Sequence, residues 1–414
     1  MQRFILPFLL IISVSFVGII LSMRNLLLIV VVLFAIGCKN AHKNGYGHAT
    51  RVLKPSIGWD SVGSGIKGTV NALAVYKGNL YAGGGIDSAG GMPIHGIAMW
   101  DGSKWHSVGS GIRGNVNALI VYKDELYAGG YFDSAGGKPY SCIAKWNGIK
   151  WSDVDTINDV IALATFNNRL YATGFNDSAD NRTTHTIGTW DGKEWDSISN
   201  PDKRWELRSL CPYNNNLYAG GRVGKDSSLV VLGKYGWAIV GKSFPFEIST
   251  MLEYKNELYL AGGDASGNSS THIMKWNGKA WGKPGAGLKG QIKSLAIYNN
   301  RLYTGGQFAR VNGVYTGCIA SWDDTAWAAS GGGINLKSVE LEKICPVNEA
   351  NLVVYVDTTP NKRGMIYYDT LFANLSVNAM LEYKGQLYIA GKFDYAGGVP
   401  SQNIARYKDP AKQN

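Results

Sequence analysis

The chain has 414 residues, of which 45% are apolar and 17% are charged, and its formal net charge is +10. This balance suits a packed globular protein and excludes an intrinsically disordered chain. The basic residues are scattered singly, whereas nucleic-acid binding needs a concentrated basic stripe, so we expect no nucleic-acid partner.

The first 37 residues contain no acid and are almost wholly apolar. Residues 4–22 could span a membrane by their length. However, residues 23–38 form a complete signal, with a start Met, a basic residue, an apolar run and small residues before Cys38. The ending "AIGC" resembles the lipobox of bacterial lipoprotein signals. We therefore expect Met23 to be the true start, and a genuine membrane helix at 4–22 is the alternative.

Three segments follow from this reading. Residues 1–37 are a leader and are set aside from the fold. Residues 38–55 carry the lipid-modified Cys38 and a flexible polar tether, and residues 56–410 form a single repeat domain. The lipoprotein resemblance implies a location in the bacterial cell envelope, at the outer membrane, with contact to the membrane only through the lipid. The expected oligomeric state is a monomer.

The repeat domain is recognised by the phrase "LYAGG", which occurs at 80–84, 126–130 and 217–221. Four variants and one degraded copy, "LVVYV" at 352–356, bring the number of copies to eight. Their spacing of about 44 residues is typical of a propeller or a helical array, and the strand-rich composition excludes the helical array.

One unit, residues 105–151, shows the local structure most clearly. The segments "VNALIVY", "LYAGGYF" and "CIAKW" predict three strands, and "NG" predicts a tight hairpin into a fourth strand that begins with Trp. Four antiparallel strands per repeat are typical of a propeller blade. Twelve of the 13 Trp residues fall at such hairpin positions, where we expect them to pack between blades. The paired glycines are expected where a side chain would clash with the next blade.

These motifs carry a family resemblance. A Gly-Gly doublet after an apolar strand, followed by an aromatic residue, Asp/Asn-Gly and another Trp, is similar to the kelch repeat of galactose-oxidase-type propellers. The variant "AGG…IA.W(D/N)G..W" also resembles repeats of fungal bud-site surface proteins and bacterial exported proteins. The resemblance covers residues 56–408 and implies the fold, because it rests on scaffold residues rather than on a functional site.

The sequence therefore predicts an all-β protein, a β-propeller of four-stranded antiparallel blades. Eight first strands are expected, so we expect eight blades; seven are the alternative, because the unit at 327–372 is degenerate. The predicted strand at 57–63 has no blade before it, and the last unit has no fourth strand. We expect these two to pair and close the ring, which removes exposed sheet edges. The expected first strands begin near Val70, Val116, Val160, Leu207, Ile248, Ile292, Leu341 and Val377.

No metal site, cofactor or catalytic motif is expected. His95, His185 and His272 lie at similar positions in separate blades and cannot converge on one metal. The Asp that follows the second strand supplies only one carboxylate per loop, too few for calcium. Equivalent positions in separate blades also lie too far apart for a disulfide, so we expect free, buried thiols. These are Cys142, Cys211, Cys318 and Cys345.

The candidate ligand site is a ring of mostly polar residues near the channel mouth. They follow the first apolar residue of each first strand, so symmetry should place them together. Trp205, the only Trp outside the repeat pattern, is expected in a loop before Arg208, where an aromatic residue beside an Arg would suit a sugar or peptide. The ring positions are Asn71, Asn117, Ile161, Arg208, Ser249, Lys293, Glu342 and Asn378.

Three functions remain open. The first is a non-catalytic binding or interaction scaffold for a protein or glycan of unknown identity. The second is a glycan-active lyase or hydrolase, which two carboxylates converging at the channel mouth would favour. The third is a purely structural surface protein, which a sealed channel without a pocket would favour.

Overall fold

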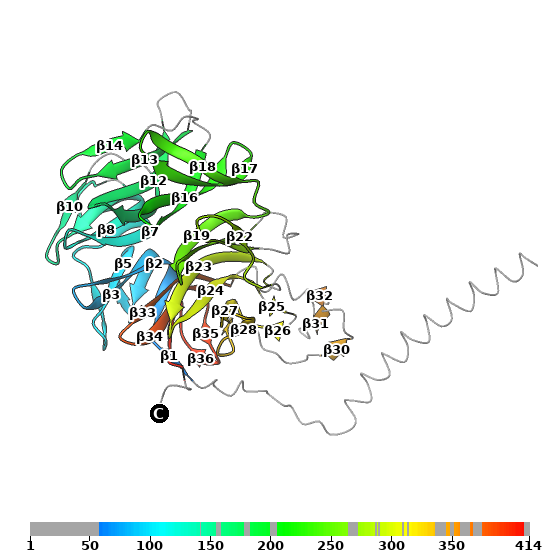
Figure 1. Cartoon of the computed structure of the whole chain (residues 1–414). Coiled ribbons are helices and arrows are strands. Elements are labelled where there is room, and N and C mark those ends of the chain that lie inside the picture. Colours follow the sequence, from blue (N-terminus) through cyan, green and yellow to red (C-terminus); the bar gives the residue numbers. More distant parts are fainter. Residues whose placement is uncertain are drawn as a thin grey trace, which may run out of the picture. The chain divides into compact units, whose positions relative to one another are not determined.

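The computed structural model describes residues 58–409, apart from 141, 155–158, 178–182, 199–204, 264–271, 286–287, 289, 309, 313, 336–344, 348–351, 357–364 and 367–374. The described residues form a β-propeller of seven four-stranded antiparallel blades (Figure 1). None of these residues lies in a helix long and apolar enough to cross a membrane. The leader, Cys38 and the tether fall outside the described residues.

Each blade runs from an inner first strand to an outer fourth strand. The first strands of blades 1 to 7 are β2 (Ile66–Tyr76), β7 (Ile112–Tyr122), β11 (Val160–Phe166), β15 (Trp205–Tyr213), β19 (Glu247–Tyr254), β23 (Gln291–Tyr298) and β33 (Ser376–Tyr383). The second strands are β3 (Asn79–Ala89), β8 (Glu125–Ala135), β12 (Arg169–Asp177), β16 (Asn216–Val223), β20 (Glu257–Gly263), β24 (Arg301–Gln307) and β34 (Gln386–Lys392).

The outer strands contain the Trp hairpins. The third strands are β5 (Ile97–Trp100), β9 (Ile143–Trp146), β13 (Thr183–Trp190), β17 (Asp226–Gly233), β21 (Ile273–Trp276), β27 (Ile319–Trp322) and β37 (Ile404–Tyr407). The fourth strands are β6 (Trp105–Ser107), β10 (Trp151–Asp153), β14 (Trp195–Ile198), β18 (Gly236–Lys242), β22 (Trp281–Gly282), β28 (Trp327–Ala329) and β1 (Trp59–Ser61).

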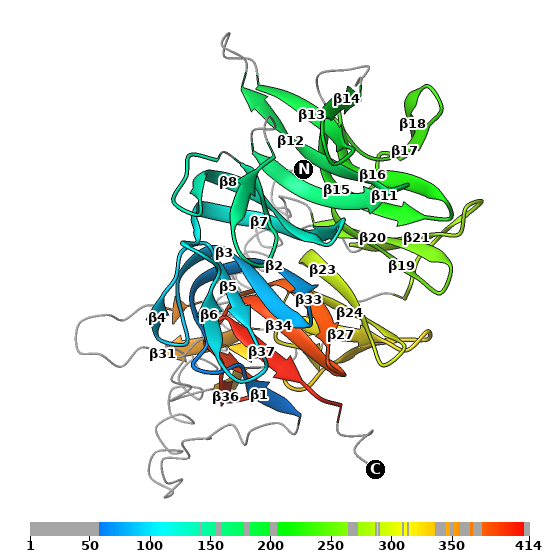
Figure 2. The same ribbon diagram turned by 90° about the vertical axis from the view of Figure 1, so that its left-hand side faces the viewer.

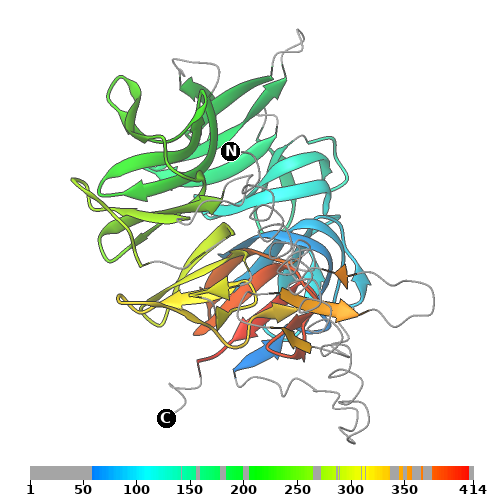
Figure 3. The same cartoon turned by 90° about the vertical axis from the view of Figure 1, so that its right-hand side faces the viewer.

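The first and last parts of the propeller lie side by side. Strand β1 pairs antiparallel with β37, so that Trp59 lies opposite Tyr407, and the two strands are neighbours in Figure 2. The N-terminal strand thus supplies the fourth strand of blade 7. The first strand of blade 1, β2, contacts both β7 and β33, and Figure 3 shows the last blade between the blue first blade and the yellow sixth.

The prediction of eight blades is wrong, because the described residues form seven. The degraded copy at 352–356 forms β31 (Leu352–Val356), which pairs with β30 (Cys345–Val347) and β32 (Met365–Ile366) in a separate three-stranded sheet. No glycine directly follows the strand at 352–356 and no Trp hairpin comes after it, whereas the second strand of each of the seven blades contains at least one glycine. This segment is an insertion, because β23 of blade 6 contacts β33 of blade 7 directly.

Several short strands lie outside the four main strands of the blades. In blade 1, β4 (Met92–Pro93) pairs with β3. Strands β25 (Arg310–Val311) and β26 (Val314–Tyr315) form a small hairpin. Three more make a small sheet of their own: β29 (Ile334–Asn335), β35 (Tyr395–Ala396) and β36 (Val399–Pro400).

The core consists of apolar side chains between successive blades. Glycines of the doublet make this close packing possible: a Cβ added to Gly83 would lie 2.6 Å from Val116 of the next blade, and one on Gly305 would lie 2.5 Å from Val377. Trp105 and Trp151 are 1% and 5% exposed, as expected for hairpin residues that pack between blades. Burial of these aromatic and aliphatic groups is the main stabilising term.

Candidate functional site at the channel

The predicted ring of polar residues corresponds to one structural feature, a β-bulge in the first strand of every blade. In each blade the register between the first and second strands shifts at this residue, which has no partner on the second strand. A bulge redirects a side chain out of the regular alternation and is common beside functional sites. The seven bulge residues are Asn71, Asn117, Ile161, Arg208, Ser249, Lys293 and Asn378.

Three bulge asparagines join neighbouring blades. The amide of Asn117 donates to the Val160 carbonyl at 3.0 Å, and that of Asn378 donates to the Val70 carbonyl at 3.1 Å. Asn71 donates to Asn115 Oδ1 at 3.0 Å, and its contact with the Val116 carbonyl is longer, 3.4 Å. These amides are therefore engaged in holding the ring together and offer less to a ligand than the sequence alone suggests.

Blade 5 uses a hydroxyl for the same purpose. Ser249 Oγ donates to the Ile292 carbonyl at 2.7 Å. In blade 6 the bond comes from the residue after the bulge, since Ser294 Oγ donates to the Val377 carbonyl at 3.2 Å. We call these contacts the inner blade-joining bonds.

Arg208 and Lys293 depart from this pattern because neither donates such a bond. Arg208 Nε lies 2.6 Å from Glu247 Oε1 of the next blade, and Arg208 Nη2 lies 3.6 Å from Glu206 Oε2 of its own blade. Glu206 and Glu247 occupy the same register position, two residues before the bulge. These two carboxylates, Arg208 and Lys293 form what we call the charged arc of blades 4 to 6.

Lys293 is half-buried in blade 6. Burial lowers the pKa of its ammonium group, because removal from water disfavours the charged form. The thiol of Cys318 interacts electrostatically with this ammonium group, and burial raises the pKa of that thiol to about 12. That thiol is therefore neutral near pH 7 and supplies no counter-charge.

Trp205 does not lie in a loop, as the sequence reading expected. It is the first residue of β15 and is 4% exposed. Its ring belongs to the apolar cluster between blades 3 and 4, with Ile187, Leu207 and Trp237. The ring is therefore covered by its neighbours. The sequence-based prediction missed this because β15 begins at Trp205, two residues before the predicted start at Leu207. Glu342 lies outside the described residues.

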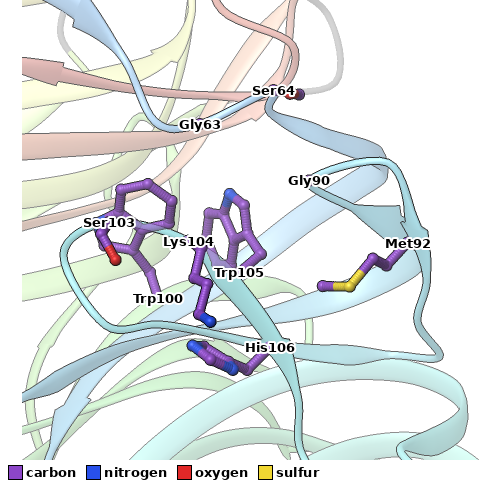
Figure 4. A pocket seen from close by; sticks show the side chains of 9 residues that line it. All are labelled: Gly63, Ser64, Gly90, Met92, Trp100, Ser103, Lys104, Trp105 and His106. Atoms are coloured by element: carbon purple, nitrogen blue, oxygen red, sulfur yellow. The ribbon is translucent and has the colours of Figure 1, made fainter.

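A cavity of about 340 Å³ opens elsewhere, at the outer edge of blade 1 (Figure 4). His106 Nε2 lies 2.7 Å from Asp101 Oδ2 there, and this contact is the main reason why the pKa of Asp101 lies well below its usual range. Three segments within residues 63–106 build the cavity, and one of them is the Trp hairpin of blade 1, which the sequence predicts to pack between blades rather than to form a site. The lining residues are Gly63, Ser64, Gly90, Met92, Trp100, Ser103, Lys104, Trp105 and His106.

The described thiols and histidines bring no metal site together. Cys142, Cys211 and Cys318 are free and buried, as the sequence predicts, and nothing is described of the Cys345 side chain. His272 is 1% exposed. In the part of the chain that the structure describes, no three His, Cys, Asp or Glu side chains gather as a possible ligand set.

The fold and the channel residues define the class of protein, a seven-bladed β-propeller with a charged arc on its inner strands. Residues 57–243, which span blades 1 to 4, match the family model of the Rax2 C-terminal β-propeller domain. No curated protein matches the chain significantly.

Two solved structures are similar to this chain at low sequence identity. The computationally designed Ika8 protein is 14% identical with a TM-score of 0.47, and the alignment covers 85% of this chain and 100% of that one. YCF48 bound to D1 peptide is 13% identical with a TM-score of 0.47, and the alignment covers 85% of this chain and 95% of that one.

Proposed function

We propose that the protein is a non-catalytic binding scaffold of the bacterial cell envelope. In this proposal Cys38 carries the lipid, β1 closes the ring of kelch-like blades, and a protein or glycan ligand binds at the channel. β-Propellers commonly serve as protein-interaction scaffolds, and function in such folds lies in sites placed on the scaffold rather than in the scaffold itself.

One observation carries the proposal. At a position where four other blades use Asn or Ser to join neighbouring strands, blades 4 and 6 place Arg208 and Lys293 instead. With Glu206 and Glu247 they give the first strands of blades 4 to 6 four charged side chains. Rigid elements hold binding groups more precisely than loops do, so the charged arc is the best supported ligand site.

The test is a thermal-shift and direct-binding screen of the purified chain against peptide and glycan libraries. A ligand that binds the native state raises the melting temperature by mass action. We expect an Arg208→Ala, Lys293→Gln double variant to lose the shift, whereas Lys104→Ala, in the outer cavity, keeps it. A shift lost only in Lys104→Ala would move the site to blade 1, and no shift with any library would contradict the proposal in favour of a purely structural role.

The second candidate, a glycan-active lyase or hydrolase, is favoured by one specific contact. Glu206 and Glu247 both reach Arg208, so two carboxylates converge on one side chain. Paired carboxylates are the usual acid and base of glycoside hydrolysis. Product release from polysaccharides by the wild type, abolished in both Glu206→Gln and Glu247→Gln, would establish this activity and displace the binding proposal.

The anchor is tested separately from the site. We expect cells fed with an alkyne-tagged fatty acid to label the wild-type chain and not a Cys38→Ser variant. Loss of the label with membrane association unchanged would instead support a membrane helix at residues 4–22, and retention of the label in that variant would show that Cys38 is not the acylated residue.

A further inference from the structure

Lys293 stands at a bulge position where four other blades have an Asn or Ser that donates a blade-joining bond. In blade 6 the inner blade-joining bond is made by the next residue, since Ser294 Oγ donates to the Val377 carbonyl at 3.2 Å. The contact between blades 6 and 7 therefore does not need Lys293. A half-buried lysine has lost part of its hydration, and at this position it gains no blade-joining bond in return.

Other half-buried lysines of the propeller are neutralised. Lys145 Nζ lies 2.7 Å from Glu125 Oε2, and Lys275 Nζ lies 2.7 Å from Glu257 Oε2. Lys293 forms no ion pair with any described carboxylate. The residue two positions earlier in its strand, where blades 4 and 5 have Glu206 and Glu247, is the uncharged Gln291.

The charge of the surrounding arc limits what can neutralise Lys293. Arg208 is already contacted by Glu206 and Glu247, so these three groups together carry one net negative charge. A polyanion that extended from Lys293 along the neighbouring first strand β19, which contacts β23, would meet this negative charge and be repelled by it. A single carboxylate satisfies the ammonium without that penalty and forms a charge-assisted hydrogen bond.

We propose that Lys293 is the anchor for a single carboxylate that a peptide ligand places in the channel, as an Asp or Glu side chain or as a C-terminus. This inference rests on the proposed binding function and narrows its ligand to a peptide with an isolated acidic group. Glu206 and Glu247 favour a peptide over an acidic polysaccharide, since a chain of uronates brings several negative charges to the same arc.

The experiment uses the full chain with its lysines ¹³C-methylated, so that each lysine gives its own NMR signal. The probes are a short blocked peptide with one Glu, the same peptide with Gln, an oligogalacturonate and inorganic phosphate. We expect the Glu peptide alone to shift the Lys293 signal and raise the pKa of that amine, since a bound anion favours its charged form.

Variants separate this inference from the function on which it rests. Lys293→Gln should weaken Glu-peptide binding by about tenfold, as expected for the loss of one charge-assisted bond, while Lys293→Arg restores most of it. Lys275→Gln, a lysine paired outside the channel, should leave binding unchanged. Ser294→Ala removes the blade-joining bond but keeps the ammonium, and should also bind normally.

Each remaining outcome contradicts a definite statement. A peptide that binds without moving the Lys293 signal overturns the anchor and keeps the binding function. An oligogalacturonate that shifts Lys293 when the Glu peptide does not overturns the peptide ligand. Equal binding of Glu and Gln peptides removes the carboxylate requirement, and no binding by any library member overturns both proposals.

Discussion

The junction between blades 2 and 3 and the junction between blades 3 and 4 are built differently. At the first, Asn117 donates to the Val160 carbonyl, Tyr122 to the Asn168 carbonyl and Trp195 to the Val154 carbonyl. At the second, the three equivalent residues are Ile161, Phe166 and Trp237.

None of these three makes such a bond among the described residues. Ile161 and Phe166 have no donor, and the indole nitrogen of Trp237 is buried without a partner.

The comparison separates two ways of holding blades together. Most other junctions repeat the polar pattern: the tyrosines that end the first strands donate to the turn of the next blade, as Tyr76 does to the Asp124 carbonyl. Junction 3/4 relies on an apolar cluster that includes Trp205, Ile187 and Leu207. Apolar burial is strong but non-directional, so this junction keeps its cohesion and loses the bonds that set its register and angle.

The largest effect is expected for a Trp that combines both kinds of contact. Trp151 is 5% exposed and donates to the Val108 carbonyl at 2.9 Å. Trp151→Ala should lower the free energy of unfolding by about 3–5 kcal/mol, the range for deletion of a buried aromatic residue. Trp237→Ala, with similar burial but no bond, should cost about 1 kcal/mol less. Equal losses, measured by urea denaturation, would show that the bond contributes nothing.

Hydrogen exchange should reveal the weaker junction without any substitution. Three missing bonds, each worth about 0.5–1.5 kcal/mol, predict that amides of β11 and β15 open with a free energy about 2–4 kcal/mol below those of β7. Sub-global opening of this kind is common where stabilising contacts are few. Uniform protection of all first strands, measured by exchange mass spectrometry, would mean that the apolar cluster compensates fully.

The bulge residues allow the same comparison one bond at a time. Asn117→Ala removes the donor and leaves the Val160 carbonyl without it, so the free energy of unfolding should fall by about 1–3 kcal/mol. Ile161→Ala at the equivalent position removes only part of an aliphatic side chain, and its cost should follow the apolar area lost. If the two variants unfold at the same denaturant concentration, the inner blade-joining bonds are not a source of stability.

The sequence contained the repeat unit, the Trp hairpins and the unpaired strand at 57–63, because each depends on local patterns that recur. It also placed the bulge residues at one position. The sequence could not show that the Asn117 amide donates a hydrogen bond to a backbone carbonyl 43 residues away. Every residue has a backbone carbonyl, so the sequence does not indicate which one will accept. The prediction of an eighth blade was wrong for a related reason. The sequence of a short strand such as 352–356 does not show which other strands it will pair with.

The smallest effect is expected for a substitution that adds a hydrogen bond to the junction between blades 3 and 4. Phe166 stands where six other blades have a Tyr whose hydroxyl reaches the second turn residue of the next blade, as Tyr122 reaches the Asn168 carbonyl at 2.8 Å. Phe166→Tyr should therefore donate to the Asn215 carbonyl and stabilise the protein by about 0.5–1.5 kcal/mol. The reverse change, Tyr122→Phe, should destabilise it by a similar amount. If Phe166→Tyr unfolds at the wild-type denaturant concentration while Tyr122→Phe is destabilised, the angle between blades 3 and 4 differs from that of the other junctions. The polar pattern would then be absent because the geometry does not permit it.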